Sequence, residues 1–281
     1  MSAIATTAVV ATLDGDLEGA VSVKERLLAL GEELGAPGQA LMQASAATAR
    51  SLIYLGRPEE WLTLESQQAE LAGVEGQVQA TYRARALAYV GKAAEAREAL
   101  AVPLQEWVMS RKQDEVQISY LFQLLEPAVL AEHQEAVAIL VPLLAPVSHL
   151  AAVYGDPTCL ARHLGAGAAL LGEPEQARAY YLQALEVCAK IRHRPDIALT
   201  RLGLAELLLA EAEKGDASPL VAVHPELVKG RTARGSTGSP RADEMRREAL
   251  EHLDFAIEEF REMKMQPSLE RALRHKELLK A

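Results

Sequence analysis

One short pattern recurs along the chain and constrains its fold more than any other feature. Each copy has a residue suited to end a helix, then a few polar, Pro or Glu residues, then a small residue in a second helix. Glycine ends a helix at low cost because it readily adopts the left-handed conformation needed there. The copies begin at intervals of 41, 35, 40 and 41 residues. They are Gly15–Ala20, Gly56–Trp61, Gly91–Ala96, Ala131–Ala136 and Gly172–Ala177.

Each interval is long enough for two helices of ordinary length and two short turns. Internal repeats in which every unit is a helix pair are typical of solenoid proteins. Leu164–Gly165 and Leu202–Gly203 stand where tetratricopeptide repeats carry a Leu-Gly pair on their first helix. We therefore expect residues 1–281 to form one all-α domain, a right-handed superhelix of about six antiparallel helix pairs of the tetratricopeptide type.

The amino-acid composition agrees with a helical fold. Hydrophobic residues make up 49% of the chain but aromatic residues only 4%, and alanine and leucine, which favour helices, supply most of the apolar side chains. The residues that favour strands never gather into alternating runs bounded by turn residues, so essentially no strand is expected. Trp61 occupies the small-residue position of its copy and is expected to fill a wider gap between helices.

The sixth repeat is interrupted. Its first helix is predicted to run to about Glu213, and its second resumes near Arg241. The segment between them, residues 215–240, has no hydrophobic period, several Gly and Ser, and few large apolar side chains. Such a segment buries too little apolar surface to offset the entropy of ordering, so it is predicted to be a mobile, solvated loop.

Charge and cysteine content exclude several classes of protein. The formal net charge is −10, which disfavours nucleic acid as a partner because its phosphates need a basic surface. Two cysteines, Cys159 and Cys188, are too few for a disulfide framework and suit a reducing cytoplasm. We also see no signal peptide and no uncharged apolar run of membrane-spanning length, so no membrane association is expected.

Four segments of the C-terminal half have a distinctive sequence: Cys159–Gly165, Arg178–Tyr181, Arg194–Arg201 and Phe260–Met265. Through them, the chain from about Tyr154 onward resembles the C-terminal repeat region of large bacterial signalling proteins that join a class III adenylate/guanylate cyclase domain to a STAND-type signal-transduction ATPase. The resemblance implies a scaffold or sensor module, either alone or as part of a longer protein.

The sequence carries no motif for catalysis. There is no Gly-x-x-x-x-Gly-Lys-Ser/Thr loop for phosphates, and no Ser or Cys lies in a Gly-x-Ser-x-Gly-like turn. Cys159 and His163 share a helix face, but zinc needs at least three converging ligands and no third is apparent. We therefore expect a protein that is not an enzyme, with no catalytic residue, metal site or cofactor.

Binding is expected on the concave face, which the first helix of each pair lines in tetratricopeptide stacks. Arg50, Arg85 and Arg162 occupy equivalent positions in three repeats, and a row of guanidinium groups suits an acidic peptide. The alternative is that these arginines pair with carboxylates inside the stack. The predicted groove residues are Gln43, Arg50, Thr81, Arg85, Ile118, Leu121, Leu125 and Arg162.

The function predicted from these features is a non-catalytic scaffold or sensor in bacterial signalling that docks a peptide or partner domain in its concave groove. The alternative is a regulatory domain of a larger cyclase/ATPase protein that senses a small molecule. In the first hypothesis, replacing Arg50, Arg85 and Arg162 together by alanine should weaken binding of an acidic peptide and leave the melting temperature nearly unchanged.

Overall fold

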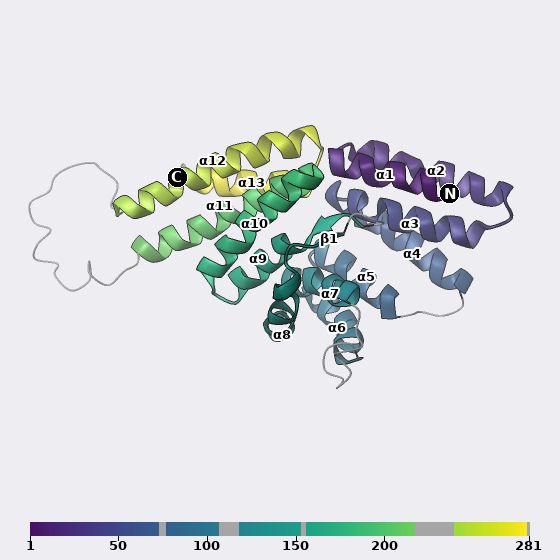
Figure 1. Cartoon of the computed structure of the whole chain (residues 1–281), viewed down its shortest axis with the longest axis horizontal. Helices are drawn as coiled ribbons and strands as arrows, with labels where there is room; N and C mark the ends of the chain where they lie inside the picture. The colour runs from purple at the N-terminus through teal and green to yellow at the C-terminus, as the bar shows by residue number, and fades with distance from the viewer. Residues whose placement is uncertain (73–76, 107–117, 153–155, 217–238, 280–281) are drawn as a thin grey trace, which may run out of the picture.

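A computed structural model describes residues 1–72, 77–106, 118–152, 156–216 and 239–279 of the chain. These residues are almost entirely helical, which confirms the all-α prediction (Figure 1). The helices are α1 (Ser2–Asp14), α2 (Leu17–Glu33), α3 (Pro37–Tyr54), α4 (Pro58–Ala72), α5 (Gln77–Tyr89), α6 (Ala93–Leu104), α7 (Ile118–Leu130), α8 (Gln134–Leu144), the short 3-10 helix η3 (Ala145–Val147), α9 (Leu160–Leu170), α10 (Pro174–Ile191), α11 (Arg194–Asp216), α12 (Pro240–Glu262) and α13 (Gln266–Leu278).

The recurring turns end odd-numbered helices as predicted, with one correction. In the fourth copy the left-handed residue is Glu132 (φ 53°), one position after the predicted Ala131. The small position of that copy therefore falls at the buried Val137. A non-glycine residue in this conformation costs about 1–2 kcal/mol, which the packing of α7 against α8 offsets. The left-handed glycines of the other four copies are Gly15, Gly56, Gly91 and Gly172.

The Leu-Gly pairs have a packing role. A Cβ atom at Gly165 of α9 would lie 2.6 Å from the Tyr181 ring, and one at Gly203 of α11 would lie 2.7 Å from it. Tyr181 is 5% exposed and belongs to α10, between these two helices in the chain. Glycine thus allows two helices to approach opposite ends of one aromatic side chain.

Helices near the N-terminus pack against helices near the C-terminus. Helices adjacent in sequence pack together, and among the odd-numbered ones α1 packs on α3, α5 on α7, α7 on α9 and α9 on α11. Helix α1 also packs on α11, and α3 on α13, so the N- and C-terminal helices share the largest hydrophobic core (Figure 1). Among the described residues α3 and α5 do not make a close helix pair of this kind. Trp61 (1% exposed) packs near this wider gap, as expected.

A two-residue antiparallel ribbon lies in front of α9. Strand β1 (Ala151–Ala152) pairs with β2 (Thr158–Cys159), with Ala152 opposite Thr158. These two short strands are the only ones in the described residues, in line with the prediction of essentially no strand, and α9 begins directly after them at Leu160. The backbone of Thr158 is extended as part of β2. Figure 1 shows β1, its partner strand, near the centre of the molecule.

Other predictions concern residues outside the described ranges or the surface. Most of the predicted mobile loop, 215–240, lies outside the described residues, although α11 ends and α12 begins at its borders.

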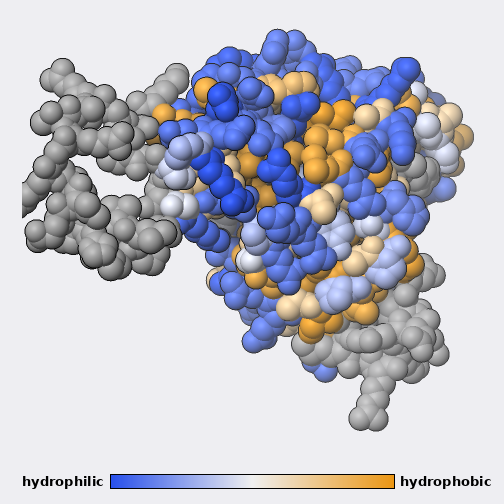
Figure 2. All heavy atoms as spheres, turned by 60° about the vertical axis from the view of Figure 1, so that its left-hand side comes forward, coloured by the Kyte–Doolittle hydropathy of each residue, from blue (hydrophilic) through white to orange (hydrophobic). Residues whose placement is uncertain are grey.

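None of the described helices combines the length and apolar character needed to cross a membrane. One face of the surface is mainly hydrophilic with smaller hydrophobic patches (Figure 2).

Candidate functional site

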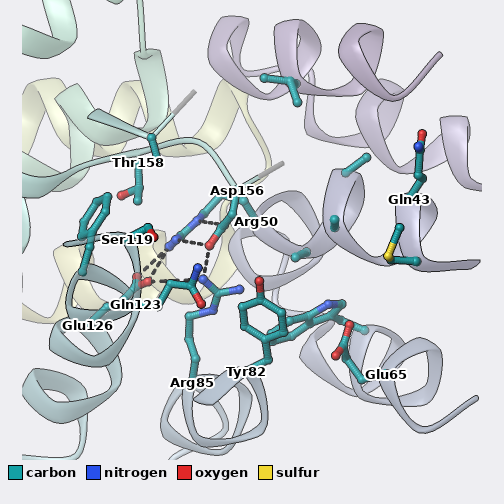
Figure 3. A pocket seen from close by; sticks show the side chains of 18 of the residues that line it. Gln43, Arg50, Glu65, Tyr82, Arg85, Ser119, Gln123, Glu126, Asp156 and Thr158 are labelled. Carbon is teal, nitrogen blue, oxygen red and sulfur yellow. Dashed lines mark hydrogen bonds and ion pairs between the residues drawn. The ribbon is translucent and has the colours of Figure 1, made fainter. Parts of the chain in front are cut away.

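Charged side chains from several helices meet at the centre of the molecule. Arg50 of α3 is 1% exposed. Its Nη1 donates to both carboxylate oxygens of Glu126 in α7, at 2.7 and 2.9 Å. Its Nε and Nη2 donate to Asp156, just before β2, at 2.7 and 3.0 Å (Figure 3). Arginine bound by two carboxylates through paired N–H groups is among the strongest polar arrangements in proteins.

Arg85 of α5 approaches the same carboxylates from the other side. Its Nη1 bonds to Asp156 and lies 3.9 Å from Glu126 Oε2. Its guanidinium carbon lies 4.8 Å from the Trp61 ring centre and 5.4 Å from that of Tyr82, close enough for cation–π attraction. Both the charge and the flat faces of this arginine are therefore already in contact with the protein.

Arg162 of α9 links these charges to α11. Its Nε lies 3.1 Å from Asp196 Oδ1, and its Nη2 lies 3.7 Å from Glu126 Oε1. Asp196 is fully buried and accepts hydrogen bonds from the Tyr54 hydroxyl at 2.7 Å and the Cys159 amide at 2.7 Å. We call Arg50, Arg85, Arg162, Glu126, Asp156 and Asp196 the central ion cluster.

The charges of the central ion cluster compensate one another, three arginines against three carboxylates. Burial opposes ionisation of Glu126, but Arg50 and its neighbours hold the pKa of that carboxyl well below its usual value. Burial also opposes ionisation of Asp196, and Arg162 lowers its pKa. His163 is buried beside Arg162, and burial first and that cation second lower its pKa to about 3. The imidazole of His163 is therefore neutral near pH 7.

A pocket of about 500 Å³ lies next to the central ion cluster. Its walls come from α1, α3, α4, α5, α7, β1, β2 and the first turn of α9, and Figure 3 shows side chains that line it. Its volume falls within the range of small-molecule sites. We call it the inner pocket. The lining side chains that carry an amide or hydroxyl group are Gln43, Gln68, Tyr82, Ser119, Gln123 and Thr158.

Three buried polar atoms around the inner pocket have no hydrogen-bond partner among the described residues. They are Gln43 Oε1, Gln123 Oε1 and Arg85 Nε. Such an atom costs about 1–3 kcal/mol when it stays unpaired. A ligand or water that supplies the missing hydrogen bonds would recover part of that cost, so these atoms favour an occupant with polar groups.

The structure brings together only part of the predicted groove. Gln43, Arg50 and Arg85 line the inner pocket, whereas Thr81 is buried away from its lining. Arg162 lies behind the lining, within the central ion cluster. Of the predicted apolar residues, Leu121 and Leu125 belong to a hydrophobic core and Ile118 is 45% exposed.

The role predicted for the arginines needs correction. Arg50, Arg85 and Arg162 do converge, but each is paired with buried or half-buried carboxylates rather than free for an acidic ligand. The alternative, pairing inside the stack, is what the structure has. It follows that replacing them cannot leave the melting temperature unchanged.

Four carboxylates were missed from the sequence. Asp156 and Asp196 look like ordinary helix-opening residues, and Glu65 lies on an amphipathic helix. Glu126 does have a signal, because it is a single acid within the apolar run of α7. An isolated acid in such a run must find a buried cation.

Cys159 and His163, which the sequence places on one helix face, do not form a joint site. Cys159 contacts Cys188, and His163 Nε2 lies 2.8 Å from the Thr158 hydroxyl, so the two members of the predicted pair contact different groups. Within the described ranges, no three His, Cys, Asp or Glu side chains are grouped so that they could hold a metal ion. Comparison with protein-family models and with curated proteins finds no match for the chain.

Proposed function

We propose that this chain is a non-catalytic regulatory module that binds a small molecule in the inner pocket. The observation that carries the proposal is a mainly apolar cavity of about 500 Å³ whose wall includes buried polar atoms without partners. Natural ligand sites combine apolar walls with a few inward polar groups in this way.

The fold supports a regulatory role for the pocket. We propose that the helix pairs form a tetratricopeptide-like solenoid of about six units, as in the repeat region of bacterial cyclase/ATPase signalling proteins. Because α1 packs on α11 and α3 on α13, the helices that surround the pocket form a closed ring in which each helix contacts its neighbours. A ligand between α3 and α5 lies inside that ring. A change in the α3–α5 separation is then transmitted to both ends of the chain.

Docking of a partner peptide is the second candidate. It is favoured by apolar side chains that remain exposed at and near the pocket: Met42, which lines it, is 47% exposed, and Ile118, beside the lining residue Ser119, is 45% exposed. A peptide could place one side chain in the pocket and cover these residues.

The proposal is tested by a pocket-blocking variant. Ala46 lines the inner pocket and is exposed, so Ala46→Trp fills the cavity without replacing a core residue. Ala94→Trp, at an exposed position of α6 outside the pocket, is the matched control. A small-molecule library is screened by thermal shift against the unmodified chain and both variants. We expect ligands that stabilise the unmodified chain and Ala94→Trp but not Ala46→Trp. The proposal would be contradicted if the ligands found stabilised all three proteins equally, or if no compound in the library stabilised the unmodified chain.

A further inference from the structure

One carboxyl of the inner pocket is not compensated by a cation. Glu65 of α4 lines the pocket and accepts a hydrogen bond from the Ser45 hydroxyl. That hydroxyl in turn accepts a hydrogen bond from Trp61 Nε1–H at 3.0 Å. Among the described residues no Lys, Arg or His nitrogen lies within ion-pair distance of Glu65. Among the described residues, the hydrogen-bond partner of Glu65 is therefore a neutral hydroxyl.

The other charges of the pocket wall cancel. Arg50 and Arg85 line the pocket, and both are bound to Glu126 and Asp156, which line it as well. With two cations and two anions paired at one end, Glu65 leaves the wall with an excess of negative charge when ionised. Figure 3 shows Glu65 beside Tyr82, away from the ion pairs around Asp156.

We infer, on the basis of the proposed function, that the ligand of the inner pocket is a small organic ammonium ion whose charge pairs with Glu65. An ammonium group has N–H donors only, and the pocket offers acceptors in Glu65 and in the unpartnered oxygens of Gln43 and Gln123. The apolar body of such an ion would lie against Tyr82 and Phe122, which are partly exposed lining residues.

An anionic ligand fits this wall poorly. It would face Glu65 and would find Arg50 and Arg85 already bound to carboxylates. To reach them it would have to displace Asp156, and an acid so displaced loses its paired contacts. The inference therefore reverses the ligand charge expected from the sequence.

The state of Glu65 agrees with a site that lacks its counter-ion. Burial raises the pKa of its carboxyl, while the hydrogen bond from Ser45 and the charge of Arg85 act in the opposite direction without overcoming it. A bound ammonium ion would supply the missing charge. Binding should then release the proton from whatever fraction of Glu65 is protonated.

The test uses three probes with the same aromatic body and different charge: 2-phenylethylammonium, 2-phenylethanol and 3-phenylpropanoate. Their affinities are measured by titration calorimetry or ligand-observed NMR for the unmodified chain, Glu65→Gln, and Glu59→Gln. Glu59 is exposed on the same helix and serves as the matched control. Ala46→Trp reports whether a probe binds in the pocket, and circular dichroism confirms that each variant is folded.

We expect the ammonium probe to bind roughly tenfold or more tightly than the alcohol, as a charge-assisted hydrogen bond provides. Glu65→Gln should abolish this preference and leave alcohol binding unchanged, and Glu59→Gln should retain it. Preference for the carboxylate, or equal binding of all three probes that Ala46→Trp blocks, overturns the inference and leaves the proposed pocket intact. If none of the probes binds, or Ala46→Trp leaves binding unchanged, the inference fails and the pocket assignment loses its support.

Discussion

Replacing Arg50 by methionine is expected to destabilise the fold strongly. Methionine keeps the length of the side chain and removes the guanidinium, which makes four contacts of 2.7–3.0 Å with two carboxylates. Asp156 retains Arg85, but the nearest remaining cations of Glu126 are Arg162 at 3.7 Å and Arg85 at 3.9 Å.

The size of the effect follows from the burial of the partner left behind. Removing one member of a buried ion pair costs about 3–5 kcal/mol because the other charge stays buried without compensation. Total stabilities are about 5–15 kcal/mol, so this is a large fraction. For a chain of this size we expect a fall in the melting temperature of about 5–15 °C.

Urea denaturation followed by far-ultraviolet circular dichroism measures the change, with Arg57→Met as the control. Arg57 also binds two carboxylates, Glu60 at 2.6 Å and Glu18 at 3.2 Å, but its side chain is 36% exposed. Exposed pairs contribute about 0–1 kcal/mol, so the control should lose little. Adding Glu126→Gln to Arg50→Met should recover part of the loss, because it removes the uncompensated charge.

Two results would refute this reasoning. If Arg50→Met costs no more than Arg57→Met, the central ion cluster does not hold the odd-numbered helices together. If Glu126→Gln deepens the loss in the Arg50→Met background, the cost does not come from an uncompensated carboxylate.

The other predictions concern packing and pH. Gly165→Ala should destabilise the fold by about 1–3 kcal/mol, although alanine favours helices, because its Cβ would overlap the Tyr181 ring; Gly38→Ala, with open space around it, should be neutral or stabilising in the same urea assay. The folded pKa of His163 is about 3 against 6.5 for the free side chain. The unfolded chain therefore takes up a proton below pH 6.5, whereas the folded chain stays unprotonated at His163, so stability should fall by about 2 kcal/mol between pH 6.5 and 4.5. His163→Gln should flatten this dependence in urea midpoints measured across that range, and an unchanged slope would contradict it. Affinity for the ammonium probe should rise with pH through the raised pKa of Glu65, because the ionised form attracts the cation. The groups that act on this carboxyl are Ser45 of α3, with Trp61 of α4 behind it, and Tyr82 and Arg85 of α5. Calorimetric titrations at several pH values test this, and an affinity independent of pH would contradict it.

The fold class could be predicted because its signals are local. A glycine that ends one helix and a small residue in the next act within a few positions, so the pattern at Gly172–Ala177 is visible in one segment. The shift at Glu132 was missed because a non-glycine residue in the left-handed conformation leaves no mark in the sequence. The contacts of α1 with α11 and of α3 with α13 were missed for another reason, since no local pattern encodes which distant helices meet.

The convergence of two arginines could be predicted from the sequence, but their pairing could not. Periodicity placed Arg50 and Arg85 at equivalent positions of their repeats, and both line the inner pocket. Their partners come from elements 71 to 106 positions away in the chain. From the sequence alone a row of arginines suggests a cationic surface, because the carboxylates that pair with them cannot be identified there.

The charge of a ligand therefore has to be inferred from groups that the protein leaves uncompensated, not from the charges it contains. Arg50 and Arg85 are prominent in the inner pocket, yet each already has a carboxylate, and a ligand gains little from a cation that is paired. Glu65 is less prominent, and its hydrogen-bond partner among the described residues is a hydroxyl. Because a partly buried charge without an ion-pair partner gains more from an added counter-charge than a paired one does, Glu65 should dominate selectivity. Glu65→Gln should accordingly change which probe binds more than how stably the chain folds, whereas Arg50→Met should do the reverse.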